Sequence, residues 1–244
     1  MANMNFIAPS VYCVDEYVIS SCSYTFHGYS ILVSEQGMSA SRISFESDNV
    51  SPVDVENMII NQTSKIIVFF ESDAFRLLET LKKLSSVLNS LPFIRTVLIY
   101  AELPSVWLYY TLRRLVNSND KLSLVRIASF SNIEKCARNN LNTSHDDSRS
   151  LLDELTRRSC KTTLKYFTKR ELDVVLNSFR GITVRKQSEL MGVSNKTIYK
   201  HRKEGLHKMH LMSSWLNEKH ISMTKVTSMN YKDQKNHQSG SGDV

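Results

Sequence analysis

The chain has 244 residues, 41% of them apolar, which is enough for one large domain or two small domains with a buried core. Its four widely spaced cysteines contain no Cys-x-x-Cys pair, and no apolar run approaches the ~18–20 residues of a membrane span, so disulfide-scaffold, zinc-ribbon and membrane proteins are not indicated. The net charge of +7 is concentrated in residues 156–210, with 14 Lys/Arg and 4 Asp/Glu. This asymmetry predicts a polyanionic partner for that segment; the alternative is a solvated basic face.

The first 140 residues alternate short apolar runs with segments of helical periodicity. The expected strands are residues 11–14, 30–33, 66–70, 96–101 and 122–127, and the expected helices are residues 74–89, 104–116 and 132–141. Such alternation favours a parallel sheet with helices on both faces. Residues 34–60 show no interpretable pattern.

Two polar segments divide the rest of the chain. Residues 142–160 are expected to be a linker that ends in a short helix, 151–160. Residues 223–244 are polar and end in SGSGDV, which predicts a disordered tail.

The basic segment begins with a helix-start signal. Thr168 and Glu171 form a capping box, in which each side chain bonds the other residue's backbone amide. An apolar stripe of helical spacing follows, formed by Leu172, Val175, Leu176 and Phe179. Gly181 then provides a left-handed end.

A second helix, 184–191, ends at Gly192, and Ser194 caps a third helix, 195–208. This third helix is roughly 21 Å long, enough to lie in a major groove. We expect Ile198, Leu206 and Met209 to face inward. The outer face then carries Lys196, Tyr199, Lys200, Arg202 and Lys203. The alternative is an amphipathic core helix with solvated lysines.

Residues 167–209 resemble the LuxR/FixJ/NarL-type helix-turn-helix in the pieces FTKREL, Gly181, LMGVS and NKTIYKHR. The resemblance implies an all-α four-helix domain over residues 161–222, with a fourth helix at 213–222 that packs through Trp215 and Leu216. It implies base contacts from Tyr199, Lys200 and Lys203. The other implied DNA contacts are Lys196, Thr197, Arg202, Ser194, Arg185 and Lys186. The sequence departs from the family in its polar residues Asn177, Ser178 and Gln187 and in Gly205.

Proteins with this module often carry a response-regulator receiver, and residues 1–141 resemble that flavodoxin-like α/β domain. Asp15 and Glu16 match the acidic pair after the first strand. Glu71, Tyr100 and Arg126 stand where a receiver has its phosphoacceptor Asp, its Thr/Ser and its Lys. The altered positions imply a degenerate receiver. An unrelated α/β domain is the alternative.

The whole plan resembles auxiliary regulators of enteric bacteria of the RcsA/BglJ kind. This implies a cytoplasmic, nucleoid-associated transcription regulator that binds double-stranded DNA without phosphorylation. It would act as a homodimer or as a heterodimer with a related response regulator, with no cofactor, metal or membrane. The alternatives are a phosphorylation-controlled response regulator and a protein-binding adaptor without DNA binding. We do not expect an enzyme, because no Gly-rich phosphate loop, Gly-x-Ser-x-Gly or His-Glu-x-x-His motif is present.

Overall fold

The computed structural model describes residues 16–45, 56, 58, 65–91, 94, 96–129, 133, 149–157 and 164–238, with the side chains of the last helix described up to Glu218. Its strands are β1 (Glu16–Ile19), β2 (Ala40–Arg42), β3 (Lys65–Phe69), β4 (Thr96–Tyr100), β5 (Val125–Ala128) and β6 (Arg149–Ser150). Its helices are α1 (Ser23–Ser34), α3 (Ala74–Ser90), α4 (Ser105–Leu115), η1 (Asn119–Leu124), α6 (Leu151–Arg157), α7 (Lys169–Phe179), α8 (Val184–Met191) and α9 (Asn195–Gln238).

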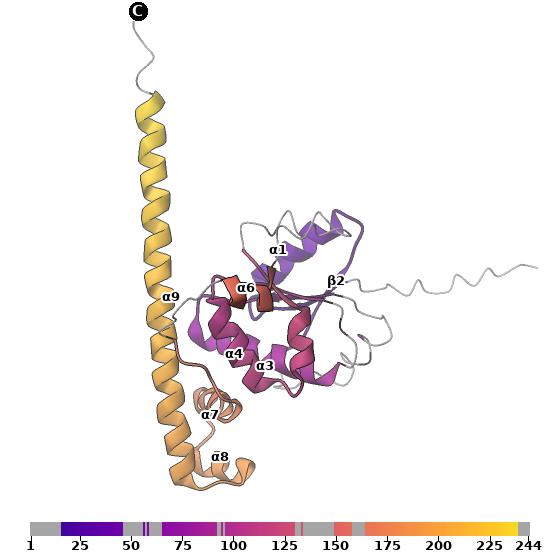
Figure 1. The fold of residues 1–244 in the computed structure, drawn as a ribbon, viewed down its shortest axis with the longest axis vertical. Helices are drawn as coiled ribbons and strands as arrows, with labels where there is room; N and C mark the ends of the chain where they lie inside the picture. The colour runs from indigo at the N-terminus through magenta and orange to yellow at the C-terminus, as the bar shows by residue number, and fades with distance from the viewer. Residues whose placement is uncertain are drawn as a thin grey trace, which may run out of the picture.

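One sheet organises the N-terminal part of the described chain. Its strand order is β2-β1-β3-β4-β5-β6, with parallel pairing except between β5 and β6. The order 2-1-3-4-5 is that of the flavodoxin-like doubly wound sheet. Figure 1 shows α1 on one side of this sheet, α3 and α4 on the other, and α7 to α9 as a helical region next to α3 and α4. The predicted fold class, a flavodoxin-like α/β domain followed by a helical domain, is confirmed.

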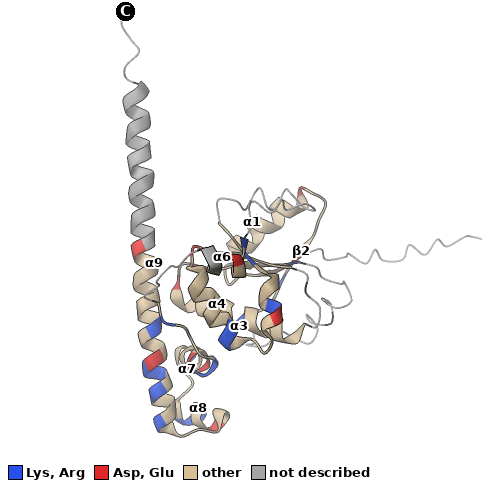
Figure 2. Ribbon diagram, viewed as in Figure 1, with Lys and Arg blue, Asp and Glu red and all other residues tan. Residues whose placement is uncertain are grey.

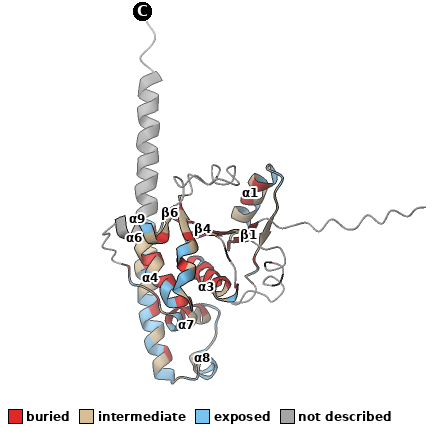
Figure 3. Ribbon diagram, turned by 45° about the vertical axis from the view of Figure 1, so that its right-hand side comes forward, coloured by how far each residue is buried: buried red, intermediate tan, exposed pale blue. Residues whose placement is uncertain are grey.

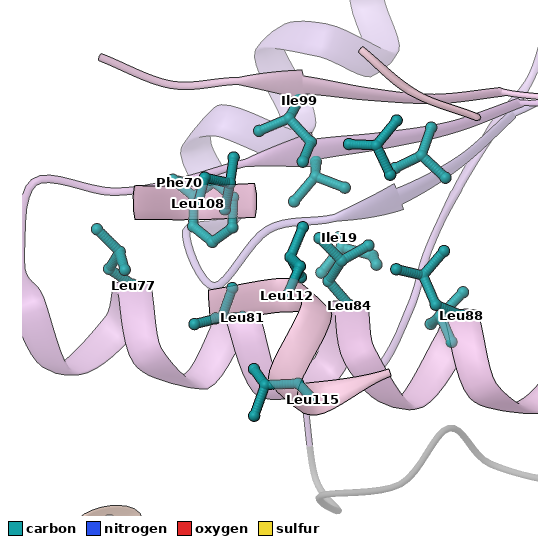
Figure 4. Packing of buried hydrophobic residues seen from close by; sticks show 14 of the residues in the cluster. Ile19, Phe70, Leu77, Leu81, Leu84, Leu88, Ile99, Leu108, Leu112 and Leu115 are labelled. Carbon is teal, nitrogen blue, oxygen red and sulfur yellow. The ribbon is translucent and has the colours of Figure 1, made fainter. Parts of the chain in front are cut away.

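The sheet separates two apolar layers. On β3, Ile66 and Val68 face the layer of α3 and α4, whereas Ile67 and Phe69 face the layer of α1. Figure 4 shows the leucines of α3 and α4 directed toward the strands. Each fully buried leucine stabilises the fold by about 1.5–3 kcal/mol, so this layer is the main apolar contribution to the domain.

The first third of the domain differs from the prediction. Residues 30–33, expected as a strand, are the last part of α1, which buries only Tyr29 and Val33. Two buried residues give almost no 3.6-residue periodicity. The β-branched and aromatic residues of this helix are instead typical of a strand. The expected strand 11–14 lies outside the described residues, and β2 falls within residues 34–60, which showed no pattern.

The later elements follow the prediction closely. The segments 66–70, 74–89, 96–101 and 104–116 correspond to β3, α3, β4 and α4, each within a residue or two. The segment 122–127 is divided between the 3₁₀ helix η1 and β5. Of the expected helix 132–141 only Ile133 is described, and of the expected linker 142–160 only residues 149–157 are described, as β6 and α6.

The C-terminal region has three described helices where four were expected. The predicted bounds of α7 and α8 are confirmed, but the expected third and fourth helices are one continuous helix, α9, of 44 residues. This helix also includes residues 223–238, which were expected to be disordered. The reason lies in the sequence: after Gly205, α9 contains no proline or glycine, so no residue interrupts its backbone hydrogen bonds.

A close crossing between α7 and α9 fixes the helical region. Gly205 is buried there, and a Cβ atom added to it would lie 2.4 Å from Val175 Cγ2 and 3.2 Å from the Glu171 carbonyl oxygen. The buried stripe of α9 runs through Ile198, Gly205 and Met212, spaced by seven residues. Leu206 therefore lies on the flank and is 37% exposed, so its predicted inward position is wrong.

We expect Gly205→Ala to destabilise the protein by about 1–3 kcal/mol, because overpacking at the crossing outweighs the gain of about 1 kcal/mol in helix propensity. Gly28→Ala in α1 is the matched control, since no atom lies within 4 Å of its added Cβ. That control should raise the free energy of unfolding by up to about 1 kcal/mol. Urea unfolding of both variants measures the difference, and equal stabilisation by both would contradict the close crossing.

Candidate nucleic-acid interface

The helical region begins with the predicted capping box. The Thr168 hydroxyl accepts from the Glu171 backbone amide at 3.3 Å, and Glu171 Oε2 accepts from the Thr168 amide at 2.8 Å. The same carboxylate oxygen accepts from Lys208 Nζ of α9 at 2.6 Å, with both side chains only 10% exposed. One carboxylate thus starts α7 and ties it to α9.

The ionisation of Glu171 reflects these contacts. Burial raises the pKa of its carboxyl, but the hydrogen bonds from Lys208 and Thr168 lower it more, and the pKa lies below its ordinary value. The carboxylate therefore stays charged at neutral pH and stabilises the crossing of α7 and α9.

α8 and the turn after it hold the start of α9. The Thr183 hydroxyl caps α8 by accepting from the Lys186 amide at 3.3 Å, and Gly192 ends the helix in the left-handed conformation with φ of +61°. The only buried residue of α8 is Gln187, whose amide nitrogen donates to the Ile182 carbonyl at 2.8 Å and to Ser178 Oγ at 3.3 Å. The polar departures from the family pattern at Ser178 and Gln187 are thus joined by one hydrogen bond.

Ser194 caps α9 as expected. Its hydroxyl accepts from the Thr197 backbone amide at 3.2 Å and lies 2.9 Å from the Thr197 hydroxyl. The remaining amides of this first turn have no intrahelical partner and favour an anion.

The first turns of α9 present one basic face to solvent. Lys196, Lys200 and Lys203 recur at i, i+4 and i+7, opposite the stripe that contains Ile198 and Gly205. Figure 2 shows Lys and Arg gathered along this end of α9, and Figure 3 shows its outer side exposed. Arg202 is also exposed, and Tyr199 is 60% exposed. The structure therefore brings the predicted α9 residues together on an accessible surface.

The charges of this face are not neutralised from within the described chain. No ion pair joins Lys196, Lys200, Arg202 or Lys203 to a carboxylate among the residues that the structure describes. The two basic residues of α8 differ, because Arg185 and Lys186 share Glu189 at 3.4 and 3.8 Å. All three side chains are more than half exposed, so these pairs are weak and readily exchanged.

Three residues that support this face had no stated supporting role in the sequence analysis. Gly205 and Gln187 were noted only as departures from the family pattern, and Lys208 was not singled out. The charge of Lys208 and the capping role of Glu171 were both visible in the sequence, but their pairing depends on the crossing angle of two helices.

The expected receiver site has different chemistry at the carboxyl ends of the strands. Glu71, two residues after β3, accepts from the Ser21 hydroxyl and pairs with Arg76 Nη1 at 3.2 Å. Ser20 and Ser21 follow β1 where an acidic pair was expected. After β5 and β4, Ser129 Oγ donates to Glu102 Oε1 at 3.1 Å. The Glu71 carboxylate is thus already bonded from two sides.

The other expected members of the receiver site lie elsewhere. Asp15 is outside the described residues, and Glu16 begins β1 instead of following the first strand, so its predicted place is wrong. Glu16 is buried, accepting from Tyr29 Oη at 2.5 Å and from Lys65 Nζ at 2.6 Å. The prediction for Glu16 failed because this residue belongs to a strand, β1, and therefore lies at the end of that strand opposite to the one expected.

Tyr100 and Arg126 also lie within strands. Tyr100 is fully buried on the α1 side and stacks on Phe69 with ring centroids 5.1 Å apart. Arg126 pairs with Leu98 in the middle of the sheet, three residues before Ser129. The positions predicted from receiver spacing for these two residues are therefore wrong by one to three residues.

Other classes of site were also considered. Within the described residues, no group of three or more His, Cys, Asp and Glu side chains is placed to hold a metal ion. Among the same residues, no helix has the length and apolar character needed to cross a membrane.

Comparison with known proteins gives structural matches only. No family model and no curated protein match the chain. An RcsB–DNA complex matches with a TM-score of 0.37 and 13% identity, over 83% of this chain and 98% of that chain. RcsB of Salmonella typhimurium matches with a TM-score of 0.30 and 14% identity, over 84% of this chain and 98% of that chain. Full-length FixJ from B. japonicum matches with a TM-score of 0.25 and 15% identity, over 80% of this chain and 89% of that chain. TM-scores of this size do not establish relatedness, so the function is argued from this chain's own residues.

We expect Glu171→Gln to lower the free energy of unfolding by about 3 kcal/mol at pH 7, because the capping bond survives but Lys208 loses its buried partner. A carboxyl with a lowered pKa stabilises the fold above its unfolded-state pKa and loses this effect as pH falls through the folded-state pKa. The difference between wild type and variant should therefore shrink below about pH 4.5. Urea unfolding at several pH values measures it.

Glu189→Gln is the control for this series. Glu189 is 54% exposed, so its removal should change stability by less than about 0.5 kcal/mol at every pH. If the loss in the free energy of unfolding caused by Glu171→Gln stays constant down to pH 3, the charge of Glu171 does not contribute to that loss.

Proposed function

We propose that this protein is a sequence-specific DNA-binding transcription regulator that places the first turns of α9 in the major groove. The observation that carries the proposal is the exposed basic face of Lys196, Lys200 and Lys203, on a helix whose opposite face is buried against α7. An α-helix fits the major groove, where Lys and Arg side chains can reach guanine edges and phosphates. The cap at Ser194 supports this role, since helix starts attract phosphate.

The predicted residues have different roles in this proposal. Lys200, Lys203 and Tyr199 lie on the outer face of α9 and are assigned to base edges. Phosphate contacts are assigned to Lys196, Thr197, Arg202, Ser194, Arg185 and Lys186. Phosphate contacts release counterions, so affinity should fall steeply as salt rises. Dimer formation, with a second copy or with a related response regulator, belongs to the proposal on the strength of the sequence resemblance alone.

We expect Lys200→Ala and Lys203→Ala each to weaken binding to a selected duplex by about 1–3 kcal/mol and to relax its sequence preference. Selection of bound genomic fragments supplies the duplex, and fluorescence anisotropy at two salt concentrations measures affinity. Arg113→Ala is the matched control, because it removes an exposed charge from α4 and should change affinity less than twofold. Equal losses on specific and random duplexes would reassign the lysines to phosphates. A wild-type chain that ignores duplex in dilute salt would make the protein an adaptor instead.

We further propose that phosphorylation does not control the protein. The Glu71 carboxylate is engaged by Ser21 and Arg76, and serines stand where a receiver's acidic metal ligands follow β1. Incubation with acetyl phosphate and Mg²⁺ should therefore leave the intact mass unchanged. The gain of one phosphoryl group that hydroxylamine removes would instead support a phosphorylation-controlled regulator. An ordinary receiver domain, labelled under the same conditions, is the positive control, and an unchanged mass of this protein beside it supports the proposal.

A further inference from the structure

The helical region shares its apolar core with the sheet domain. Leu164 and Phe167, in the segment before α7, are buried in the same cluster as the leucines of α3 and α4. Met212 and Leu216 of α9 belong to this cluster as well. Trp107 of α4 donates from Nε1 to the Lys165 carbonyl at 3.1 Å. A shared core and this hydrogen bond hold the helical region against the sheet domain.

Side chains of α3 form a second set of contacts with α7. Lys82 pairs with Asp173, and Glu79 pairs with Arg180 at 3.2 Å. Phe75 of α3 lies against Phe179 of α7, with ring centroids 5.1 Å apart. Phe75 and Glu79 of α3 thus meet the C-terminal end of α7, and Lys82 meets Asp173 near its start. We call these three pairs the α3–α7 clasp.

The Lys82–Asp173 pair of the clasp is largely shielded from solvent. The Lys82 and Asp173 side chains are 14% and 22% exposed, so salt screens their attraction less than it would screen a surface pair. The two ion pairs have opposite polarity along α3, acidic at 79 and basic at 82. Exchange of the two partners would place like charges together, so the pairs favour one placement of α7 against α3.

We propose that the α3–α7 clasp fixes the direction in which α9 presents its basic face, so that the sheet domain and the DNA-reading helix move as one body. The contacts form a continuous series: α3 holds α7 through the clasp, and α7 holds α9 through Gly205 and the Glu171–Lys208 pair. In this arrangement Lys82, Asp173, Glu79 and Arg180 are positioning residues for α9. They lie away from the face assigned to DNA. The inference deepens the proposed function, but the rigidity itself can be measured without DNA.

The test is a distance measurement on the full chain. Spin labels are placed at Arg113→Cys on α4 and Ser214→Cys on α9, both exposed, with Cys13, Cys22, Cys136 and Cys160 replaced by serine. Double electron–electron resonance should give one narrow distance distribution, unchanged on addition of the selected duplex. Lys82→Asp should broaden this distribution, and the exchanged pair Lys82→Asp with Asp173→Lys should narrow it again.

The outcomes separate the two proposals. A broad distribution in the parent chain, a change of the mean distance on DNA binding, or a distribution unaffected by Lys82→Asp would each overturn the clasp, whether or not DNA binds. A narrow distribution in a chain that ignores duplex would leave the clasp standing and remove the proposed function. Should Lys82→Asp fail to fold, recovery of a folded, narrowly distributed protein in the exchanged pair supports the clasp, and failure of that pair as well overturns it.

Discussion

The contact between Glu171 and Lys208 is the interaction on which the helical region depends most. The carboxylate begins α7, satisfies the amide of its capping residue and neutralises a nearly buried lysine from a helix that starts 24 residues later in the chain. Without it, the close approach at Gly205 would bring two helices together around an unpaired charge, which is costly in a region of low polarity. With it, the inner face of α9 is specified, and the lysines of the outer face are left to solvent.

Carboxylates of the sheet domain are paired in a similar way. Glu16, buried at the start of β1, is matched by Tyr29 from α1 and Lys65 from β3, and so links β1 to a helix and to a neighbouring strand. At the opposite ends of the strands, Glu71 is matched by Ser21 and Arg76. Each carboxylate is used to join segments far apart in sequence. This is a structural use of acidic residues, and it differs from the cluster of unpaired carboxylates that holds a metal ion.

Sequence patterns predicted the parts of the fold that strong local signals determine. Thr168 with Glu171, the apolar stripe of α7 and the glycines at 181 and 192 defined the helical region, because caps and periodicity are encoded within a few residues. The same patterns missed β1 and α1, because only Tyr29 and Val33 of α1 are buried and its segment SILV resembles a strand. Receiver spacing, counted from the wrong strand ends, then displaced Glu16, Tyr100 and Arg126. Pairings such as Glu171 with Lys208, and the choice between one long helix and two, depend on tertiary geometry or on the absence of a breaker.

The two-sided engagement of Glu71 has a consequence for how such a regulator could be controlled inside a cell. A phosphorylation switch needs an acidic side chain that is free to react, and here the Glu71 carboxylate is already bonded to Ser21 and Arg76. For the regulator proposed above, occupancy of its DNA sites would then follow mass action, rising and falling with the number of molecules synthesised and degraded. DNA binding would then be controlled by the amount of the protein and not by a covalent modification, so expression of its gene would set its activity.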